Sequence, residues 1–358
     1  LADPDHFRGR VAAPVRSLLA RMQVLSRILR KRRFDAGALE LQLPEAKVEL
    51  DREGRVESIR DVVHDESHQV IEEFMLAANV AVATALNDRS VIFLRRIHPA
   101  PSFSKLQGFA EFVTLLGFGL KRFQSRQQLQ KVLDRAATTP CVQAVNYALL
   151  RSMKQAEYSG REEGHYALAL QEYCHFTSPI RRYPDLVIHR MIGRLIDGQR
   201  LRGLTRDQAA RLGGQCSRTE RRAEKAEREL VRIKLLEYLK KRVGETIEAL
   251  VTGVERFGVL CRGEEIPLEG LVHVSELDEE DYFDFDSAAM TLTGRRTGRS
   301  FQLGDRVRVE VAEVNLDERS VTLRMDPRSG SRRRRKSPRR AGAPQQRRRR
   351  GKGRRKRR

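Results

Sequence analysis

The 358-residue sequence has no tryptophan, and aromatic residues make up only 6% of it. The four cysteines, Cys141, Cys174, Cys216 and Cys261, stand far apart without a C-x-x-C pair, which predicts reduced structural thiols rather than metal ligands. No apolar run approaches the roughly 18 residues of a membrane span, and no apolar segment follows a charged start. These absences predict a cytoplasmic protein without a membrane partner.

Acidic residues are also missing from one region. Residues 328–358 contain 18 Lys and Arg but no Asp or Glu, and subtracting these 18 from the net charge of +22 leaves +4 for the rest. Such a block repels itself, so we expect residues 327–358 to be disordered. Flexible cations bind phosphates through counterion release, which predicts contact with structured RNA or the ribosome. A nuclear-localisation signal would have the same composition.

Apolar periodicity divides the remainder into two units. Residues 1–242 are mostly helical, with a β-hairpin around Glu53 and Gly54, and Thr205 with Gln208 fits a capping box. The helices are expected over residues 11–33, 67–86, 109–120, 142–155, 184–196 and 205–242, the last interrupted at Gly213 and Gly214.

Residues 243–326 change to the period of strands. Five short alternating segments in about 80 residues are typical of an OB-type barrel, which binds single strands across one face. The strands are expected over residues 246–254, 258–262, 270–274, 306–314 and 320–325.

The most informative segment is His175-Phe-Thr-Ser-Pro-Ile-Arg-Arg-Tyr-Pro-Asp-Leu186. Two adjacent guanidinium groups, two prolines that restrict the backbone and a pair of hydroxyls suit a rigid loop that grips a phosphate. The residues alone leave an alternative open, in which the arginines form surface salt bridges beside a helix start.

This segment resembles the signature of the ribonuclease II and ribonuclease R family at every position. Four further segments occur in the family's order: Ile71-Glu-Glu-Phe-Met-Leu-Ala-Ala-Asn79, Leu150-Arg-Ser-Met-Lys-Gln-Ala156, Gly164-His-Tyr-Ala-Leu-Ala-Leu170 and Ala226-Glu-Arg-Glu229. The resemblance covers residues 1 to about 326. It implies an α+β fold, in which 1–242 is the mostly helical carboxyl-terminal part of an RNB catalytic domain, 243–326 a five-stranded OB barrel and 327–358 a disordered basic tail.

The resemblance implies processive 3′-to-5′ hydrolysis of single-stranded RNA to nucleoside 5′-monophosphates, with Mg²⁺ as cofactor. Arg181 would contact the scissile phosphate and stabilise its developing charge. Glu72 and Glu227 would bind the terminal ribose, whose 2′-hydroxyl separates RNA from DNA. Arg182 and Tyr183 are further substrate-binding candidates. Tyr183 and His175 are secondary, because both could equally be structural. Without the family, Glu72 is an ordinary solvated helix residue and Glu227 an i,i+4 partner.

The sequence departs from the family in two places. Leu41 stands where several members have an aromatic ring that stacks on a base. The aspartate cluster that holds magnesium in the family, in a context like Asp-x-x-Asp-x-Asp-Asp, has no counterpart, and the acidic stretch from Asp278 to Asp286 is expected to be a solvated loop. Because the sequence begins at Leu1 rather than Met, we expect a fragment that is inactive alone and exposes apolar helix faces.

The barrel supports RNA binding independently. Glu255-Arg-Phe-Gly-Val-Leu260 and Gly270-Leu-Val-His-Val-Ser-Glu-Leu277 resemble the RNA-binding domain repeated in ribosomal protein S-one. This resemblance predicts Phe257 and His273 as a base-stacking surface. A core position for Phe257 is the alternative.

Two function classes therefore remain. The first is a monomeric exoribonuclease of the ribonuclease R type, with ribonuclease II as the alternative within the family. The second is a non-catalytic RNA-binding protein that keeps the catalytic fold as a scaffold.

Overall fold

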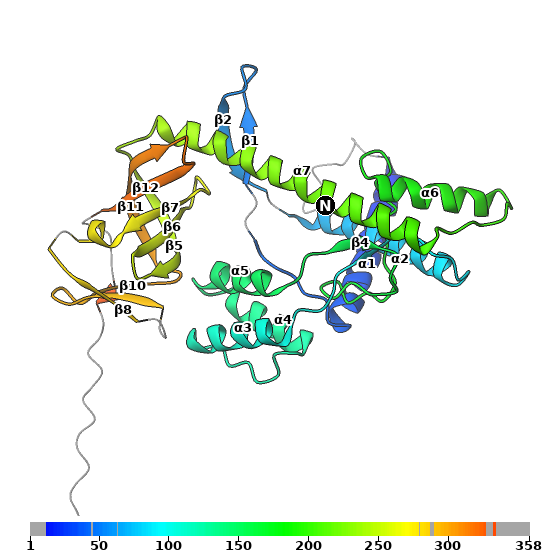
Figure 1. The fold of residues 1–358 in the computed structure, drawn as a ribbon, viewed down its shortest axis with the longest axis horizontal. Coiled ribbons are helices and arrows are strands. Elements are labelled where there is room, and N and C mark those ends of the chain that lie inside the picture. Colours follow the sequence, from blue (N-terminus) through cyan, green and yellow to red (C-terminus); the bar gives the residue numbers. More distant parts are fainter. Residues whose placement is uncertain are drawn as a thin grey trace, which may run out of the picture.

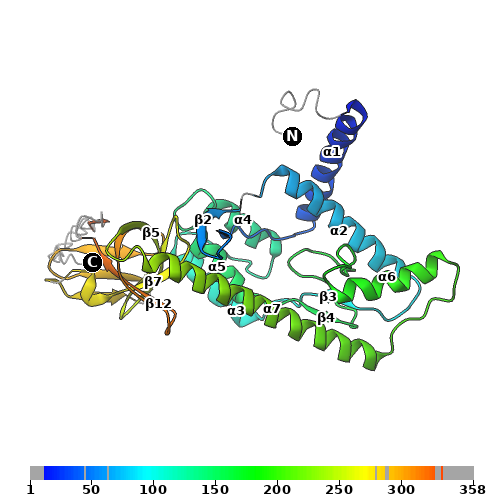
Figure 2. The same ribbon diagram turned by 90° about the horizontal axis from the view of Figure 1, so that it is seen from above.

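The computed structural model describes residues 12–43, 46–62, 64–278, 280–286, 290–326 and 332–333. A helical part and a β-barrel lie at opposite ends of one long helix, α7 (Figures 1 and 2). The helices are α1 (Ala13–Asp35), α2 (Glu66–Asn87), α3 (Phe103–Leu115), α4 (Arg126–Ala136), α5 (Val142–Ser152), α6 (Tyr183–Ile196) and α7 (Arg206–Lys240). The helical part also contains the strands β1 (Ala46–Leu50), β2 (Val56–Asp61), β3 (Arg95–Ile97) and β4 (Glu157–Ser159).

Two apolar cores hold the helical part together. Helices α3, α4 and α5 enclose one, with Phe109, Leu129 and Leu149 buried in it. The other joins the end of α2 to α6 through Leu86 and Ile188. The predicted positions of these helices are confirmed except that α3 begins and ends earlier than expected, and α4 was not predicted at all.

Helix α7 runs without a break through both glycines, so the predicted interruption is wrong. Its capping box is confirmed, because Thr205 accepts from the Gln208 N–H while the Gln208 side chain accepts from the Thr205 N–H. The glycine at 213 serves packing instead: a Cβ there would lie 2.5 Å from the Tyr158 carbonyl oxygen. Glycine at 213 therefore lets β4 lie directly against the helix.

The five predicted barrel strands are confirmed, and they close in the order β11-β12-β7-β6-β5. The strands are β5 (Thr246–Glu255), β6 (Gly258–Gly263), β7 (Glu269–His273), β11 (Arg306–Asn315) and β12 (Ser320–Met325), and a short helix, η1 (Val274–Glu276), follows β7. A second sheet was not predicted. It contains β8 (Phe283–Asp286), β9 (Thr291–Gly294), β10 (Arg299–Gln302) and β13 (Arg332–Arg333). Since Arg332 and Arg333 pair with β10, the disorder predicted for 327–358 is wrong at these two residues; the rest of that segment lies outside the described residues.

The barrel is fixed to the helical part at several points. Leu236 and Leu239 of α7 are buried in the barrel core, and Glu229 forms an ion pair with Arg319 in the β11–β12 turn. On another side, Gly304 (φ +83°) approaches Pro140 so closely that a Cβ would lie 2.7 Å from the proline carbonyl oxygen. A cavity of about 920 Å³ lies along this seam.

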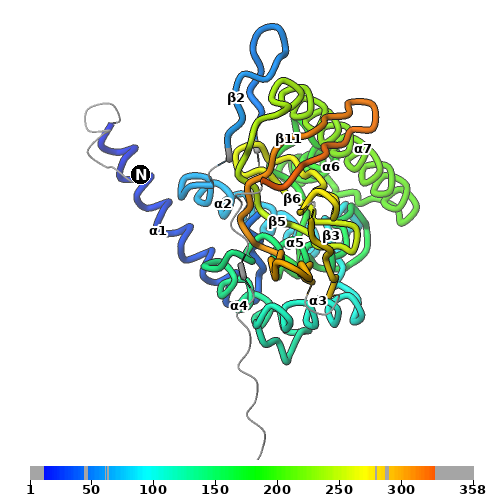
Figure 3. The backbone as a smooth tube through the Cα atoms, turned by 90° about the vertical axis from the view of Figure 1, so that its left-hand side faces the viewer, coloured from blue at the N-terminus to red at the C-terminus, as the bar shows by residue number. Residues whose placement is uncertain are grey.

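The β1–β2 hairpin projects from the body beside α7 and the barrel (Figure 3). Its predicted turn is confirmed, with Gly54 at φ +76° and Asp51 accepting from the Glu53 N–H. Val48 and Ile59 pack against the core shared by α7 and the barrel. The hairpin therefore reinforces the same junction.

The predicted exposure of apolar helix faces is found on α1. Six of its large apolar side chains are between 37% and 58% exposed: Val15, Leu18, Leu19, Val24, Leu25 and Ile28. Helix α2 is long and apolar enough to cross a membrane by length and composition alone, which the sequence reading did not anticipate. It buries Leu76, Ala83 and Leu86, as the core helix of a folded domain does.

Candidate functional site

The signature loop leads from the helical core into α6. The Ser178 carbonyl oxygen accepts hydrogen bonds from the N–H groups of Arg181 (3.3 Å) and Arg182 (3.0 Å). The Ser178 N–H in turn donates to Oδ1 of Asp185 (2.8 Å), whose side chain is fully buried. Pro184 occupies the first turn of α6, where its missing N–H costs no hydrogen bond. The loop is therefore held by both its backbone and one buried carboxylate.

The two adjacent arginines have different surroundings. Arg182 donates from Nη2 to Asp185 Oδ1 at 2.7 Å, and its side chain is only 21% exposed. Arg181 is exposed, and no ion pair or side-chain hydrogen bond engages it within the described part of the chain. Tyr183 beside it is 51% exposed. The geometry makes Arg181 available to a phosphate, whereas direct substrate contact by Arg182 and Tyr183 stays a prediction.

His175, a secondary candidate, lies beneath this loop. Its Nδ1 is 3.0 Å from the Tyr158 hydroxyl, and its ring meets those of Tyr158 and Tyr173 edge to face. Burial, together with the positive charges of Arg182 and Arg96, lowers the pKa of His175 to about 2. This neutral imidazole supports the loop from below.

Glu72 lies on α2 with its side chain 52% exposed, 3.8 Å from the guanidinium of Arg33. Its neighbour Glu73 is 3% exposed and forms a buried ion pair with the same arginine. Of the two carboxylates, Glu73 has a structural role, and Glu72 is the one that a ligand can reach.

Glu227 is exposed on α7 and has no ion-pair partner among the described residues. The i,i+4 pair beside it joins Arg228 to Glu224 at 2.5 Å, and Glu229 pairs with the distant Arg319, so neither pair involves Glu227. No hydrogen bond or ion pair joins Glu72, Arg181 and Glu227 to one another in the described ranges. A shared ribose and phosphate site between them stays a prediction.

Leu41 packs partly buried against the core of α3, α4 and α5. It is thus engaged in apolar contacts and does not present a free platform for a base.

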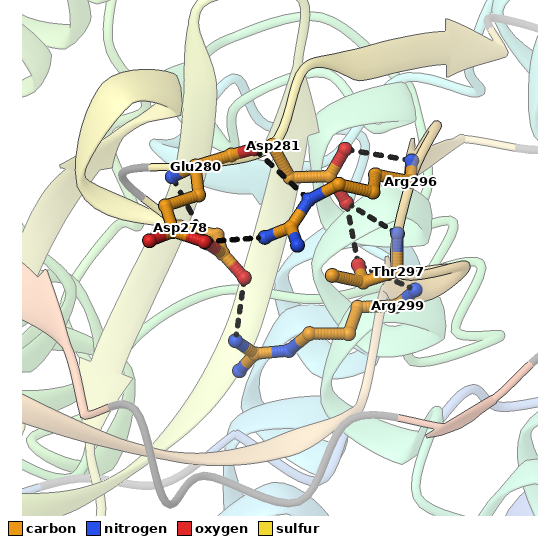
Figure 4. Close-up of polar contacts among 6 residues, drawn as sticks. All are labelled: Asp278, Glu280, Asp281, Arg296, Thr297 and Arg299. Carbon is orange, nitrogen blue, oxygen red and sulfur yellow. Dashed lines mark hydrogen bonds and ion pairs between the residues drawn. The ribbon is translucent and has the colours of Figure 1, made fainter.

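The described residues contain no group of three or more His, Cys, Asp or Glu side chains that could hold a metal ion. The acidic stretch after η1 is bound to arginines instead (Figure 4). Asp278 pairs with Arg299 at 3.3 Å and Glu280 with Arg296 at 2.9 Å. Asp278 is only 19% exposed, so the prediction of a solvated loop is wrong there.

Asp281 binds the backbone of the turn between β9 and β10. It accepts from the Arg296 and Thr297 N–H groups, each at 2.8 Å. Burial raises the pKa of Asp281, but hydrogen bonds from Thr297 and Arg296 outweigh it and lower the value to about 2. These carboxylates fasten the loop to the β9–β10 turn and do not fit a magnesium site.

The two predicted stacking residues of the barrel lie side by side. Gly258, which follows Phe257, pairs with His273 in the β6–β7 ladder, and the Val274 N–H donates to the Phe257 carbonyl oxygen at 2.9 Å. Phe257 is 51% exposed, so the alternative of a core position is wrong. His273 is exposed, and its Nδ1 lies 2.8 Å from the Ser275 hydroxyl. Two rings therefore face solvent at one end of the barrel.

Sequence reasoning missed two residues that organise the site. Asp185 belongs to the quoted signature, and its place one residue after a proline at a helix start was the available signal. Arg96 stacks over the Tyr158 ring at 4.6 Å and pairs with Glu220 of α7 at 2.6 Å. No local pattern marked Arg96, because its partners are far away in the sequence.

Comparison with known proteins gives two domain matches: the RNB domain over residues 5–198 and the S1 RNA binding domain over residues 240–325. Ribonuclease R of Vibrio parahaemolyticus is 37% identical over 321 residues, which are 86% of this chain and 38% of that protein. Ribonuclease R of Escherichia coli is 36% identical over 86% of this chain and 39% of its own length. The chain thus spans about two fifths of these relatives.

Solved structures agree. Mycoplasma genitalium RNase R in complex with ribose methylated single-stranded RNA superposes with a TM-score of 0.75 at 27% identity, covering 86% of this chain and 49% of that one. Its complex with double-stranded RNA gives a TM-score of 0.70 at 25% identity, with 86% and 50% covered. Yeast Ssd1, a pseudonuclease, shares the fold with a TM-score of 0.58 at 21% identity, covering 77% of this chain and 35% of its own.

Proposed function

Because the chain belongs to the RNB domain family of ribonuclease R, we propose that it provides the phosphate-gripping loop and the RNA-binding barrel of a 3′-to-5′ hydrolytic exoribonuclease. The products would be nucleoside 5′-monophosphates. The observation that carries the proposal is the difference between the two arginines: Asp185 holds Arg182, whereas Arg181 is exposed and has no side-chain partner among the described residues.

A guanidinium placed in this way stabilises the negative charge that develops on a phosphate during hydrolysis, and it needs no reorganisation when the reaction occurs. Glu72 and Glu227 accept hydrogen bonds from ribose hydroxyls in this proposal, which selects RNA. Magnesium is the expected cofactor of the activity. The described residues do not supply its ligands, so hydrolysis requires carboxylates from outside them.

The partners that we propose are single-stranded and structured RNA. Phe257 and His273 stack bases at the barrel, and the basic tail adds phosphate contacts that extend to the ribosome. The protein acts as a monomer in the cytoplasm in this proposal.

A non-catalytic RNA-binding protein is the second candidate. The barrel favours it, because base stacking on the exposed rings of Phe257, in the β5–β6 turn, and His273, at the end of β7, would need no metal. The fold is also compatible with it, since a pseudonuclease shares that fold.

The test is degradation of a 5′-labelled single-stranded RNA in the presence of magnesium. It compares this polypeptide with a version extended at its amino end by the part that its relatives have and this chain does not span. Shortening from the 3′ end by the extended form, suppressed by Arg181→Ala, supports the exoribonuclease. RNA binding without cleavage by the extended form supports the second candidate.

A further inference from the structure

A groove of about 820 Å³ lies between β4 and the amino-terminal half of α7, and its lining contains no residue of the signature segment. Arg206, Ala210, Gly214 and Arg218 follow one another at intervals of four residues, so they line one face of the helix. Arg221 extends this lining, and Gly160 after β4 forms part of the opposite wall. The strand runs alongside the helix here (Figure 2).

Small residues shape the groove. At its floor the contact is tight, since a Cβ on Gly160 would lie 2.7 Å from Cβ of Ala209. At Gly214 the space is open: the one neighbour within 4 Å of an added Cβ is Nη1 of Arg218, at 3.4 Å. The guanidinium of Arg218 thus lies over a gap that the missing side chain leaves.

The groove carries an excess of positive charge. Within the described part of the chain, Arg206, Arg218 and Arg221 have no carboxylate within ion-pair distance. The lining contains two acidic residues: Glu157, which pairs with Arg161 at 2.5 Å, and Glu162. Arg206, Arg218 and Arg221 thus outnumber Glu162, the lining carboxylate that has no ion pair among the described residues, and the groove is net positive.

We propose that this groove binds the sugar–phosphate backbone of an RNA strand through Arg206, Arg218 and Arg221. Guanidinium groups match phosphate oxygens in geometry as well as in charge. Twelve residues of helix separate Arg206 from Arg218, a rise of about 18 Å, so the two arginines would contact different phosphates of one strand. A mononucleotide is too short to reach both arginines.

The groove recognises phosphates rather than bases. Its aromatic lining residue, Tyr158, is 5% exposed and already bound to His175, so no ring is free for stacking. Binding should therefore be independent of sequence and sensitive to salt. The inference rests on the proposed RNA substrate, and it adds a second contact surface on the helix that connects the signature loop to the barrel.

The test measures binding of a labelled oligouridine of about 20 nucleotides to the whole chain by fluorescence anisotropy, over a range of salt concentrations. The variant combines Arg206→Gln, Arg218→Gln and Arg221→Gln. On single strands each phosphate contact contributes about 0.7 to the slope of log K against log salt, so the slope should become shallower by about 2. A matched control replaces the exposed Arg190, Arg194 and Arg200 by Gln, with the same change in net charge and an unchanged slope expected.

A second variant, Ala210→Leu, fills the groove without changing its charge and should weaken binding by itself. Equal slopes for the groove variant and its matched control would overturn the inference, as would full affinity in Ala210→Leu. Competition by uridine 5′-monophosphate that abolishes the difference between groove variant and parent would also overturn it, in favour of a nucleotide site. Failure of the parent chain to bind RNA at all would instead contradict the proposed function.

Discussion

Asp185 and Arg182 form an ion pair at 2.7 Å in which the carboxylate is fully buried and the guanidinium is mostly covered. The same carboxylate oxygen receives the Ser178 N–H, so one atom fixes both the side chain of Arg182 and the start of the turn. Arg181 is left as the exposed member of the pair of arginines. Arg182 thus stabilises the loop, and Arg181 is exposed to solvent.

Replacing Asp185 by Asn should lower the free energy of unfolding by about 3–5 kcal/mol, because it leaves Arg182 partly buried without a counter-charge. Urea denaturation of the two proteins measures this directly. The exposed Asp197→Asn at the end of α6 serves as the control, and equal losses in both variants would contradict the structural role of Asp185.

Replacing Arg181 by Ala should change the free energy of unfolding by less than about 0.5 kcal/mol, as expected for an exposed and unpaired side chain. In the extended, active form the same change should lower the rate of hydrolysis by about 10²–10³-fold, the usual effect of removing one positioned charge donor. Denaturation tests the predicted effect on stability, and single-turnover kinetics tests the predicted effect on the rate of hydrolysis. A large loss of stability would show that Arg181 is structural.

Acid should destabilise the helical part through its buried histidines. Burial lowers the pKa of His175 to about 2 and that of His165 to about 3, well below the unfolded value of about 6.5. Between those values the unfolded chain binds more protons than the folded one, so stability falls as the pH drops from 6.5 towards 3. Urea denaturation at several pH values should show this slope, and it should flatten in His175→Gln. A slope that His175→Gln leaves unchanged would contradict the assignment.

Phe257→Ala should reduce RNA affinity by about 1–3 kcal/mol, the range for loss of one base stack. Because the side chain is 51% exposed, the barrel should keep nearly all of its stability. The contrasting change is Phe301→Ala, at a fully buried ring, which should cost about 3–5 kcal/mol of stability. RNA titration and thermal denaturation together distinguish the two positions. Unchanged affinity in Phe257→Ala would remove this ring from the binding surface.

Gly304→Ala should loosen the junction between the barrel and the helical part. Its φ of +83° and its approach to Pro140 both oppose a side chain, whereas Gly298 (φ +66°) has the same kind of backbone conformation but open space around it. Gly298→Ala therefore reports the backbone strain alone, on the order of 1–2 kcal/mol. A larger loss in Gly304→Ala, measured by calorimetry, isolates the contact across the junction. Equal losses would mean that the junction does not depend on it.

Short sequence patterns predicted the helices and strands that are determined by residues close together in the sequence. The capping box at Thr205 and the alternating strands of the barrel appear where the sequence places them. Helix α4 has a clear apolar face in Leu129 and Leu133, but its short, polar sequence did not indicate a separate helix. The sheet of β8 to β10 depends on ion pairs between distant residues, such as Asp278 with Arg299, which no local period shows.

Candidate site residues could be predicted from the sequence where they belong to one continuous segment, as in the signature. The resemblance of the signature led to the prediction for Arg181, and its role at a phosphate stays a prediction, although the side chain is exposed. The contrast between Glu72 and Glu73 was not predictable in the same way, since Arg33, which buries one and leaves the other exposed, comes from another helix. The helix interruption predicted at Gly213 and Gly214 was wrong, because Gly213 instead makes room for β4 to pack against the helix.

The unbroken helix from Arg206 to Lys240 has a consequence for avidity. Its 35 residues join the two ends of the molecule without a flexible linker, over about 50 Å. In a bivalent interaction a stiff spacer gives high effective concentration to ligands that match its span and none to those that do not. On the proposed function, an RNA shortened below that span would lose contact with the barrel in one step rather than gradually. Length discrimination would then follow from the rigidity of a single helix.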